Sequence, residues 1–226
     1  MRQQDKSETI DLLEHLAHRI RNPLHSMGIN LEVAKGKIRD LPGKTAATVQ
    51  KHLEIVSSEL STTNEIIRGF TEYISPLESR RTRIRVETLL RGAYQLLREK
   101  MADNGIRVDW ELSENLPAIY VNNEQIKKAL FEILLNAAEA SNQAIIRATA
   151  KNNYVEIQIR DRGQGISSGL RPKVFDPFYT TKKGRLGMGL PIAKKMIEAN
   201  DGEIRLASGL RRGTTILVSF SRKAKK

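Results

Sequence analysis

The chain has no cysteine, no long apolar run and few aromatic side chains. Without cysteine, a disulfide framework, a zinc–thiolate site and a cysteine nucleophile are all excluded. No stretch approaches the ~20 apolar residues that are needed to span a bilayer. Met1 and Arg2 are followed by polar residues rather than by the apolar segment of a secretory signal. We therefore expect a soluble, cytoplasmic chain that makes no membrane contact of its own.

Charge is distributed unevenly along the 226 residues. Residues 1–80 carry 11 basic and 11 acidic side chains, whereas residues 81–226 carry 27 and 15 and so supply the whole net charge of +12. A basic second half favours a polyanionic partner such as nucleic acid, an acidic protein face or a phosphorylated ligand. Direct nucleic-acid binding is the weaker alternative, because only five Phe, five Tyr and one Trp are present and no binding motif is seen.

Apolar residues recur every three or four positions in the first third of the chain. One such run lies within residues 7–40 and a second within residues 49–74, separated by "DLPGKT". This spacing predicts two amphipathic helices joined by a short loop, the second ending before Pro76. Two apolar stripes enclose little core by themselves, so we expect a homodimer that completes a four-helix bundle.

The rest of the chain alternates between helical and strand patterns. Helices are expected over 87–102, 123–141 and 190–200, and strands over 106–112, 118–121, 203–208 and 214–220, with a strand hairpin around Asn152–Asn153. The middle helix is opened by an Asn cap. The pattern predicts an α+β two-layer sandwich, one sheet with helices over one face. The expected domains are a helical hairpin over 1–78, a linker over 79–83 and the sandwich over 84–226.

The stretch "EHLAHRIRNPLHSM", residues 14–27, holds three of the four histidines. At about 100° per residue, His18 points roughly 160° away from the apolar stripe of its helix, and Asn22 shares its face. Pro23 follows, although an interior proline costs a helix about 3 kcal/mol and bends it. An exposed neutral imidazole can attack phosphorus if another domain approaches it. His18 is therefore a candidate phosphoacceptor, and a merely solvated histidine is the alternative.

Three clusters in the second half of the chain suit a nucleotide. In "FEILLNAAEA", a carboxylate and an amide share a helix face and suit Mg²⁺. In "DRGQGIS", a carboxylate ends a strand and suits the exocyclic amine of adenine, while glycines let the backbone approach a ring. In "GRLGMGL", glycines precede a helix start, whose amides suit an anion. The residues are Glu132 and Asn136; Asp161, Gly163 and Gly165; Gly184, Gly187 and Gly189.

These clusters, in this order, resemble the motifs of a two-component sensor histidine kinase, over nearly the whole chain. "HRIRNPL" resembles the H-box, "EILLNAAEA" the N-box, "DRGQGI" the G1 box, "FDPFYTTK" the F-box and "GMGL" the G2 box. The run "DGEIRLASGLRRGTTILVSF" resembles the closing segment with the last glycine box. The form "DPFYTTK" with a short lid is most similar to the nitrogen-regulation type.

The resemblance implies transfer of the ATP γ-phosphoryl group to His18 and then to an aspartate of a response regulator. Mg²⁺ would be bound by Asn136, and Glu132 would assist the metal or its water. Asp161 would bind adenine, with Thr214 beside the base. The remaining nucleotide-binding positions implied by the motifs are Gly163, Gly165, Thr181, Lys182, Gly187, Gly189 and Leu190. Lys182, Lys183 and Arg185 would then account for part of the basic charge.

Arg19 departs from the family pattern. The residue after the histidine is usually acidic and takes the imidazole proton, which an arginine cannot do. We expect slow autophosphorylation unless Glu14, one turn back, substitutes. Asn22 resembles the family's amide or hydroxyl that positions water for dephosphorylating the regulator, so a phosphatase-leaning protein is also compatible with the sequence.

Two other interpretations of the sequence stay open. An ATP-binding dimeric scaffold, or pseudokinase, would signal by shape with little kinase activity, and Arg19 favours it. A chaperone, topoisomerase or mismatch-repair ATPase of the same superfamily would share Asn136, Asp161 and the glycines. Such a protein would not be expected to carry His18 and Pro23 on a preceding helical hairpin.

Overall fold

The structure is a computed structural model, and it describes residues 17, 21, 24–25, 27–29, 31–32, 35–36, 44–75, 77, 80–101, 107–182 and 185–222. The chain divides into two compact units. One comprises Met1–Ser75 and Lys182–Leu186, and the other Pro76–Thr181 and Gly187–Lys226. The domain limits expected from the sequence, 1–78, 79–83 and 84–226, stay a prediction.

The first unit is an N-terminal helical hairpin. Its long helix, α2, spans Lys44–Ile74, and the described residues between 17 and 36 are helical as well. The second predicted helix is thus confirmed. Helix α2 ends where expected, because Pro76 disfavours helical geometry at Ser75. The Ser75 hydroxyl donates to the carbonyl of Thr71 at 2.7 Å. Within the described part of the chain, no helix is both long and apolar enough to cross a membrane.

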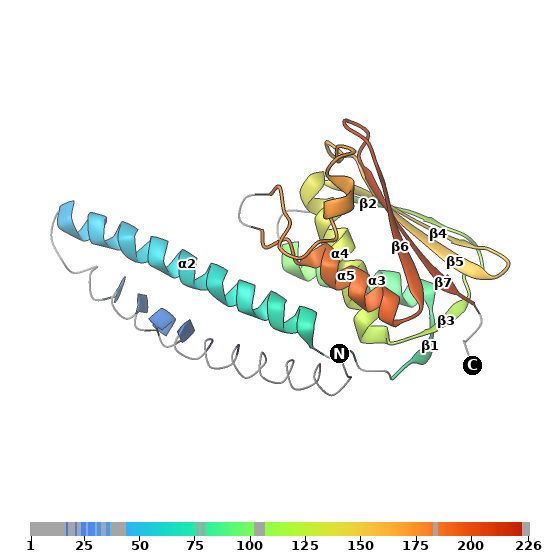
Figure 1. Ribbon diagram of the computed structural model, residues 1–226, viewed down its shortest axis with the longest axis horizontal. Coiled ribbons are helices and arrows are strands. Elements are labelled where there is room, and N and C mark those ends of the chain that lie inside the picture. The colour runs from blue at the N-terminus through green and yellow to red at the C-terminus, as the bar shows by residue number, and fades with distance from the viewer. Residues whose placement is uncertain are drawn as a thin grey trace. The chain divides into compact units, whose positions relative to one another are not determined.

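The second unit is built on a five-stranded sheet (Figure 1). The strands lie in the order β2-β4-β5-β7-β6; β2 and β4 are parallel, and every other pair is antiparallel. The predicted hairpin at Asn152–Asn153 is confirmed, because it joins β4 and β5 directly. The strands are β2 Arg107–Leu112, β4 Gln143–Ala150, β5 Tyr154–Asp161, β6 Gly202–Ser208 and β7 Thr214–Ser221.

Three helices cover one face of this sheet (Figure 1). They are α3 Val86–Met101, α4 Asn123–Ala140 and α5 Gly189–Ala199. Alternate side chains of β5, namely Val155, Ile157 and Ile159, are buried beneath them, whereas the residues between are not. This period of two is expected of a sheet with one buried face and one solvent-exposed face. The predicted sandwich with helices on one face is therefore confirmed.

A second, two-stranded sheet corrects the expectation of one sheet. β1, Thr82–Arg85, pairs antiparallel with β3, Ala118–Val121. The sequence predicts β3 but not β1, which begins inside the segment expected to be linker. The strand "TRIR" has one apolar residue, and its partner lies far along the chain, so no local pattern reveals it.

Candidate nucleotide site

Asp161 is a buried carboxylate at the end of β5, only 6% exposed. Its Oδ1 atom accepts hydrogen bonds from the backbone N–H of Gly163 at 2.8 Å and of Thr214 at 3.0 Å. Hydrogen bonds to a charged acceptor are among the stronger ones in proteins. The two donors come from the loop after β5 and the start of β7, so both segments fix the orientation of the carboxylate.

Ser208, at the end of β6, forms hydrogen bonds to the segments that hold Asp161. Its hydroxyl donates to the carbonyl of Gly213 at 2.8 Å, lies 3.0 Å from the Thr214 hydroxyl, and accepts from the N–H of Ile166 at 2.8 Å. Ser208 is not among the site residues predicted from the sequence. Its only signal is a hydroxyl that ends an otherwise regular strand pattern.

Helix α4 carries the predicted carboxylate and amide, Glu132 and Asn136, one turn apart and both half-buried. Two glycines, Gly189 and Gly163, lie where other segments of the chain approach this helix closely. A Cβ atom at Gly189 would lie 2.7 Å from Oε2 of Glu132, and one at Gly163 would lie 2.9 Å from the Cβ of Ala140, one turn beyond Asn136. The start of α5 and the loop after β5 therefore both reach the α4 face that bears the predicted metal ligands.

Gly187 and Gly213 occupy backbone conformations that only glycine adopts without strain. Their φ angles are 71° and 72°. A Cβ atom at Gly187 would lie 2.4 Å from the carbonyl oxygen of Tyr179, and one at Gly213 would lie 2.2 Å from that of Asp161. These close approaches join the "FDPFYTTK" segment to the "GMGL" segment and the last glycine turn to β5. Gly165 is in the same region of φ, at 71°.

The remaining predicted positions flank the glycine-rich segment in the sequence. Thr181 is exposed, and Leu190, the second residue of α5, is half-buried. Lys182 is half-buried and belongs to the segment that groups with the first unit. On α5, Lys194 Nζ lies 5.5 Å from the centre of the Phe175 ring. Partial burial lowers the pKa of the neighbouring Lys195.

The predicted phosphoacceptor region lies outside the described residues. This applies to His18 and Asn22, and also to Glu14, Arg19 and Pro23. Among the residues that are described, no three His, Asp or Glu side chains gather into a metal-binding group.

Residues 121–224 match the family of histidine kinase-, DNA gyrase B- and HSP90-like ATPases. Over 216 residues, the chain is 32% identical to the signal transduction histidine-protein kinase AtoS of Escherichia coli K12, covering 92% of this chain and 34% of AtoS. Residues 121–224 thus belong to this ATPase family. In this chain the ATPase domain follows an N-terminal helical region. Sporulation kinase E of Bacillus subtilis is 28% identical to the chain over 223 residues, 95% of this chain and 29% of that protein. The chain thus spans about a third of the length of these curated relatives.

Solved structures share the fold of this chain. Full-length ShkA, in complex with AMPPNP, aligns with a TM-score of 0.71 at 21% identity, over 96% of this chain and 47% of that one. Histidine kinase ThkA, in complex with the response regulator protein TrrA, aligns with a TM-score of 0.68 at 22% identity, over 97% and 65%. Both alignments include the helical hairpin as well as the sandwich.

Proposed function

We propose that this kinase transfers the γ-phosphoryl group of ATP to His18 and then to an aspartate on the receiver domain of a response regulator. The observation that carries the proposal is the orientation of Asp161, held by the N–H groups of Gly163 and Thr214. A buried carboxylate held in this way is an acceptor for the exocyclic amine of adenine. The family match over residues 121–224 supports a nucleotide at this place.

The donor set on α4 fits a magnesium ion. Asn136 offers an amide oxygen and Glu132 a carboxylate one turn away, and hard oxygen ligands are those that Mg²⁺ prefers. When bound, the ion neutralises charge on the phosphates. In this proposal Asn136 holds the ion and Glu132 orients it or its water. Positioning and charge neutralisation account for most of the acceleration of a phosphoryl transfer.

At His18, a lone pair of the neutral imidazole forms an N–P bond while the bond from phosphorus to the bridging oxygen breaks and ADP leaves. The ring proton must pass to a base. Arg19 cannot take it, because a guanidinium stays protonated. Glu14 is four residues before His18 in the sequence and is the candidate substitute. We propose slow autophosphorylation unless Glu14 takes the proton, and an added phosphatase activity in which Asn22 positions water.

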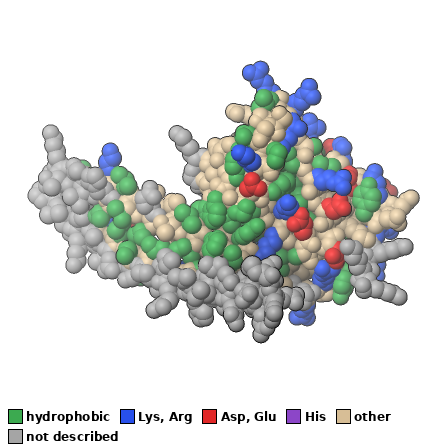
Figure 2. Space-filling view, viewed as in Figure 1, with side chains coloured by type: hydrophobic (Ala, Val, Ile, Leu, Met, Phe, Trp, Pro, Cys, Tyr) green, Lys and Arg blue, Asp and Glu red, His purple; other side chains and the backbone are tan. Residues whose placement is uncertain are grey.

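The partner and the assembly are further parts of the proposal. ThkA, which shares the fold, is known in complex with a response regulator protein, and the same class of partner is proposed here. Homodimer formation is supported by α2, where large apolar side chains are exposed: Ile55 is 49% exposed, Val56 45% and Ile66 41%. Figure 2 shows hydrophobic side chains gathered along this helix. A second α2 would bury them in a four-helix bundle.

The proposed subtype is the nitrogen-regulation type, on the form of the "DPFYTTK" segment. Phe178 in this segment has a left-handed backbone, with φ of 64°, and its ring is 50% exposed. Such a conformation is uncommon for a bulky residue and tends to be kept where it serves a function. It sits beside Gly187, which is where a short lid would begin to close.

The testing experiment follows acid-labile label on the chain after incubation with radiolabelled ATP and Mg²⁺. Wild type, His18→Ala and Arg19→Glu are compared, with His25→Ala as the matched control on the same helix. Label on wild type and on the control but not on His18→Ala supports the proposal. Equal label on His18→Ala contradicts it.

Arg19 also favours a second candidate, an ATP-binding scaffold with little kinase activity. In the same experiment, ATP binding without label on wild type would favour this scaffold. Label on Arg19→Glu alone would mean that the site and the acceptor are competent and that Arg19 limits the reaction.

A further inference from the structure

The turn after α5 contains an unusual backbone conformation. Asp201 has a φ of 57°, in the left-handed region that favours glycine. A glycine is common at this place after a helix, and in this chain Gly202 comes one residue later. A residue other than glycine carries strain in this conformation, and such strain is typical of places where the side chain has a use.

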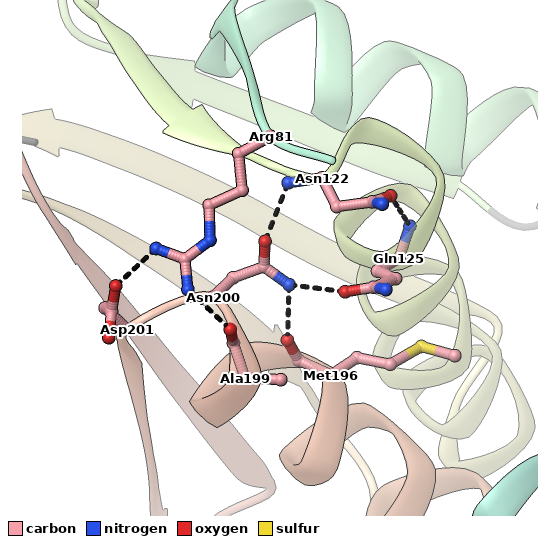
Figure 3. Close-up of polar contacts among 7 residues, drawn as sticks. All are labelled: Arg81, Asn122, Gln125, Met196, Ala199, Asn200 and Asp201. Carbon is pink, nitrogen blue, oxygen red and sulfur yellow. Dashed lines mark hydrogen bonds and ion pairs between the residues drawn. The ribbon is translucent and has the colours of Figure 1, made fainter. Parts of the chain in front are cut away.

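The side chain of Asp201 is held by Arg81. The Arg81 guanidinium donates to the Asp201 carboxylate and, through its second terminal nitrogen, to the carbonyl of Ala199 at 2.8 Å (Figure 3). Both side chains are partly buried, with 27% and 36% of their area exposed. The planar fork of arginine binds two acceptors at once, which a lysine cannot reproduce. Arg81 thus caps the C-terminal end of α5.

A buried amide network joins the same end of α5 to the start of α4. Asn200, only 3% exposed, accepts from the backbone N–H of Asn122 at 2.7 Å and donates to Gln125 at 2.7 Å and to the carbonyl of Met196 at 2.8 Å (Figure 3). Asn122 is the cap of α4. The two helices are therefore fixed to each other at one end by side chains that lie next to Arg81.

The proposed nucleotide site lies at the N-terminal end of α5 and in the middle of α4. Eleven residues along α5, Gly189 lies against Glu132 of α4. A helix of this length spans about 16 Å and moves as a rigid element. A displacement of the backbone at Asp201 therefore also displaces Gly189.

We infer that Arg81 is a positioning residue that holds the C-terminal end of α5 and thereby sets the place of Gly189 beside Glu132. The inference rests on the proposed nucleotide site and goes beyond it. Arg81 lies six residues after Ser75, in the segment that follows α2. Nucleotide affinity consequently depends on how this connecting segment is held, although Arg81 does not touch the site.

The test compares the wild-type chain of 226 residues with Arg81→Met, Asp201→Asn and the double variant, and with Arg83→Met as the control, an exposed arginine two residues further on, in β1. Asparagine tolerates the left-handed conformation, so Asp201→Asn removes the charge alone. ADP affinity is measured by calorimetry, and amide hydrogen exchange is measured over residues 189–193. Thermal unfolding shows whether each variant is folded.

Each single variant is expected to weaken ADP binding about two- to fivefold, in the range of a partly exposed ion pair, and to speed exchange at the start of α5. The double variant should equal Arg81→Met, because the ion pair that Asp201→Asn weakens is already lost in Arg81→Met, together with the bond to the Ala199 carbonyl. Unchanged exchange over 189–193, or an equal effect of Arg83→Met, overturns the inference. If Arg81→Met does not fold, Arg81→Lys replaces it, since lysine retains the charge but cannot bind both acceptors.

The two proposals fail differently. If wild type neither binds ADP nor labels His18, the proposed function fails, while exchange over 189–193 still decides whether Arg81 holds α5. If ADP binds with equal affinity to all variants and exchange is unchanged, the role of Arg81 fails and the proposed function stands.

Discussion

At the scale of single residues, backbone atoms define much of the candidate site. Asp161 is oriented by two N–H groups, and the close approaches at Gly187 and Gly213 are approaches to carbonyl oxygens. Side chains can adjust to a substitution by changing rotamer, whereas a backbone carbonyl cannot move without its segment of the chain. We therefore expect sharp responses to small substitutions at these positions.

Asp161→Asn should abolish tight ATP binding without unfolding the domain. The amide oxygen can still accept from Gly163 and Thr214, but the negative charge is lost and the new NH₂ group opposes the adenine amine. A lost hydrogen bond to a charged group costs about 1.5–3 kcal/mol, which is about ten- to a hundredfold in affinity. Calorimetry with ATP measures it. Glu156→Gln, on the other face of the same strand, is the control; a weaker affinity there would contradict the assignment.

Gly213→Ala should destabilise the domain by about 3 kcal/mol, from left-handed strain and overpacking together. The added methyl group would lie 2.2 Å from the carbonyl oxygen of Asp161. Thermal unfolding measures the change. Gly169→Ala is the matched control, because no atom lies within 4 Å of its added Cβ and its φ is not positive. Equal losses in both variants would contradict this account.

At the scale of helices and strands, local patterns predict local structure well. The sequence places α4 within one residue at its end, identifies the Asn cap, and locates the β4–β5 hairpin at Asn152–Asn153. These elements are determined by periodicity, capping and turn chemistry, all of which act over a few residues.

Features that depend on distant partners are not visible in the sequence. β1 is stabilised by β3, and the parallel pairing of β2 with β4 joins segments separated by a helix. The amide network of Asn200 depends on residues about 75 positions away. At the site, the motifs predict Asp161 and Thr214, but the support from Ser208 appears only in three dimensions.

The cap of α4 should contribute about 1 kcal/mol to the stability of the domain. The side chain of Asn122 accepts from the N–H of Gln125 at 3.1 Å. Asn122→Ala removes this bond but retains the backbone N–H that donates to Asn200. Chemical denaturation measures the loss. Asn123→Ala, at the next position, should have little effect, and a larger loss there than at Asn122 would argue against the cap.

At the scale of the whole molecule, the two units present different surfaces. The basic excess lies in residues 81–226, where an anionic nucleotide is proposed, while α2 exposes large apolar side chains. The second unit therefore has a basic surface that favours an anionic partner. The first unit has an apolar surface that favours burial against another protein surface.

Ile55→Glu together with Ile66→Glu should shift the protein from dimer to monomer. These residues are 11 positions apart, three turns of one helix face, and a charge buried in a bundle is costly. Analytical ultracentrifugation at micromolar concentration measures the mass. Glu54→Gln, exposed on the same helix, is the control. A monomeric wild type, or a dimer that survives both substitutions, would contradict the bundle.

The edges of the five-stranded sheet bear on how the protein behaves at high concentration. Within the described ranges, β2 and β6 each have one side without a neighbouring strand, and an open edge favours pairing with another molecule. Both edges carry charge: Asp109 and Glu111 on β2, Glu203 and Arg205 on β6. The hydrogen bond from Gln143 lowers the pKa of Asp109, so this carboxylate stays ionised in mildly acidic solution. Charged edges of this kind oppose aggregation by strand addition, and they leave α2 as the surface through which copies of this chain are expected to meet.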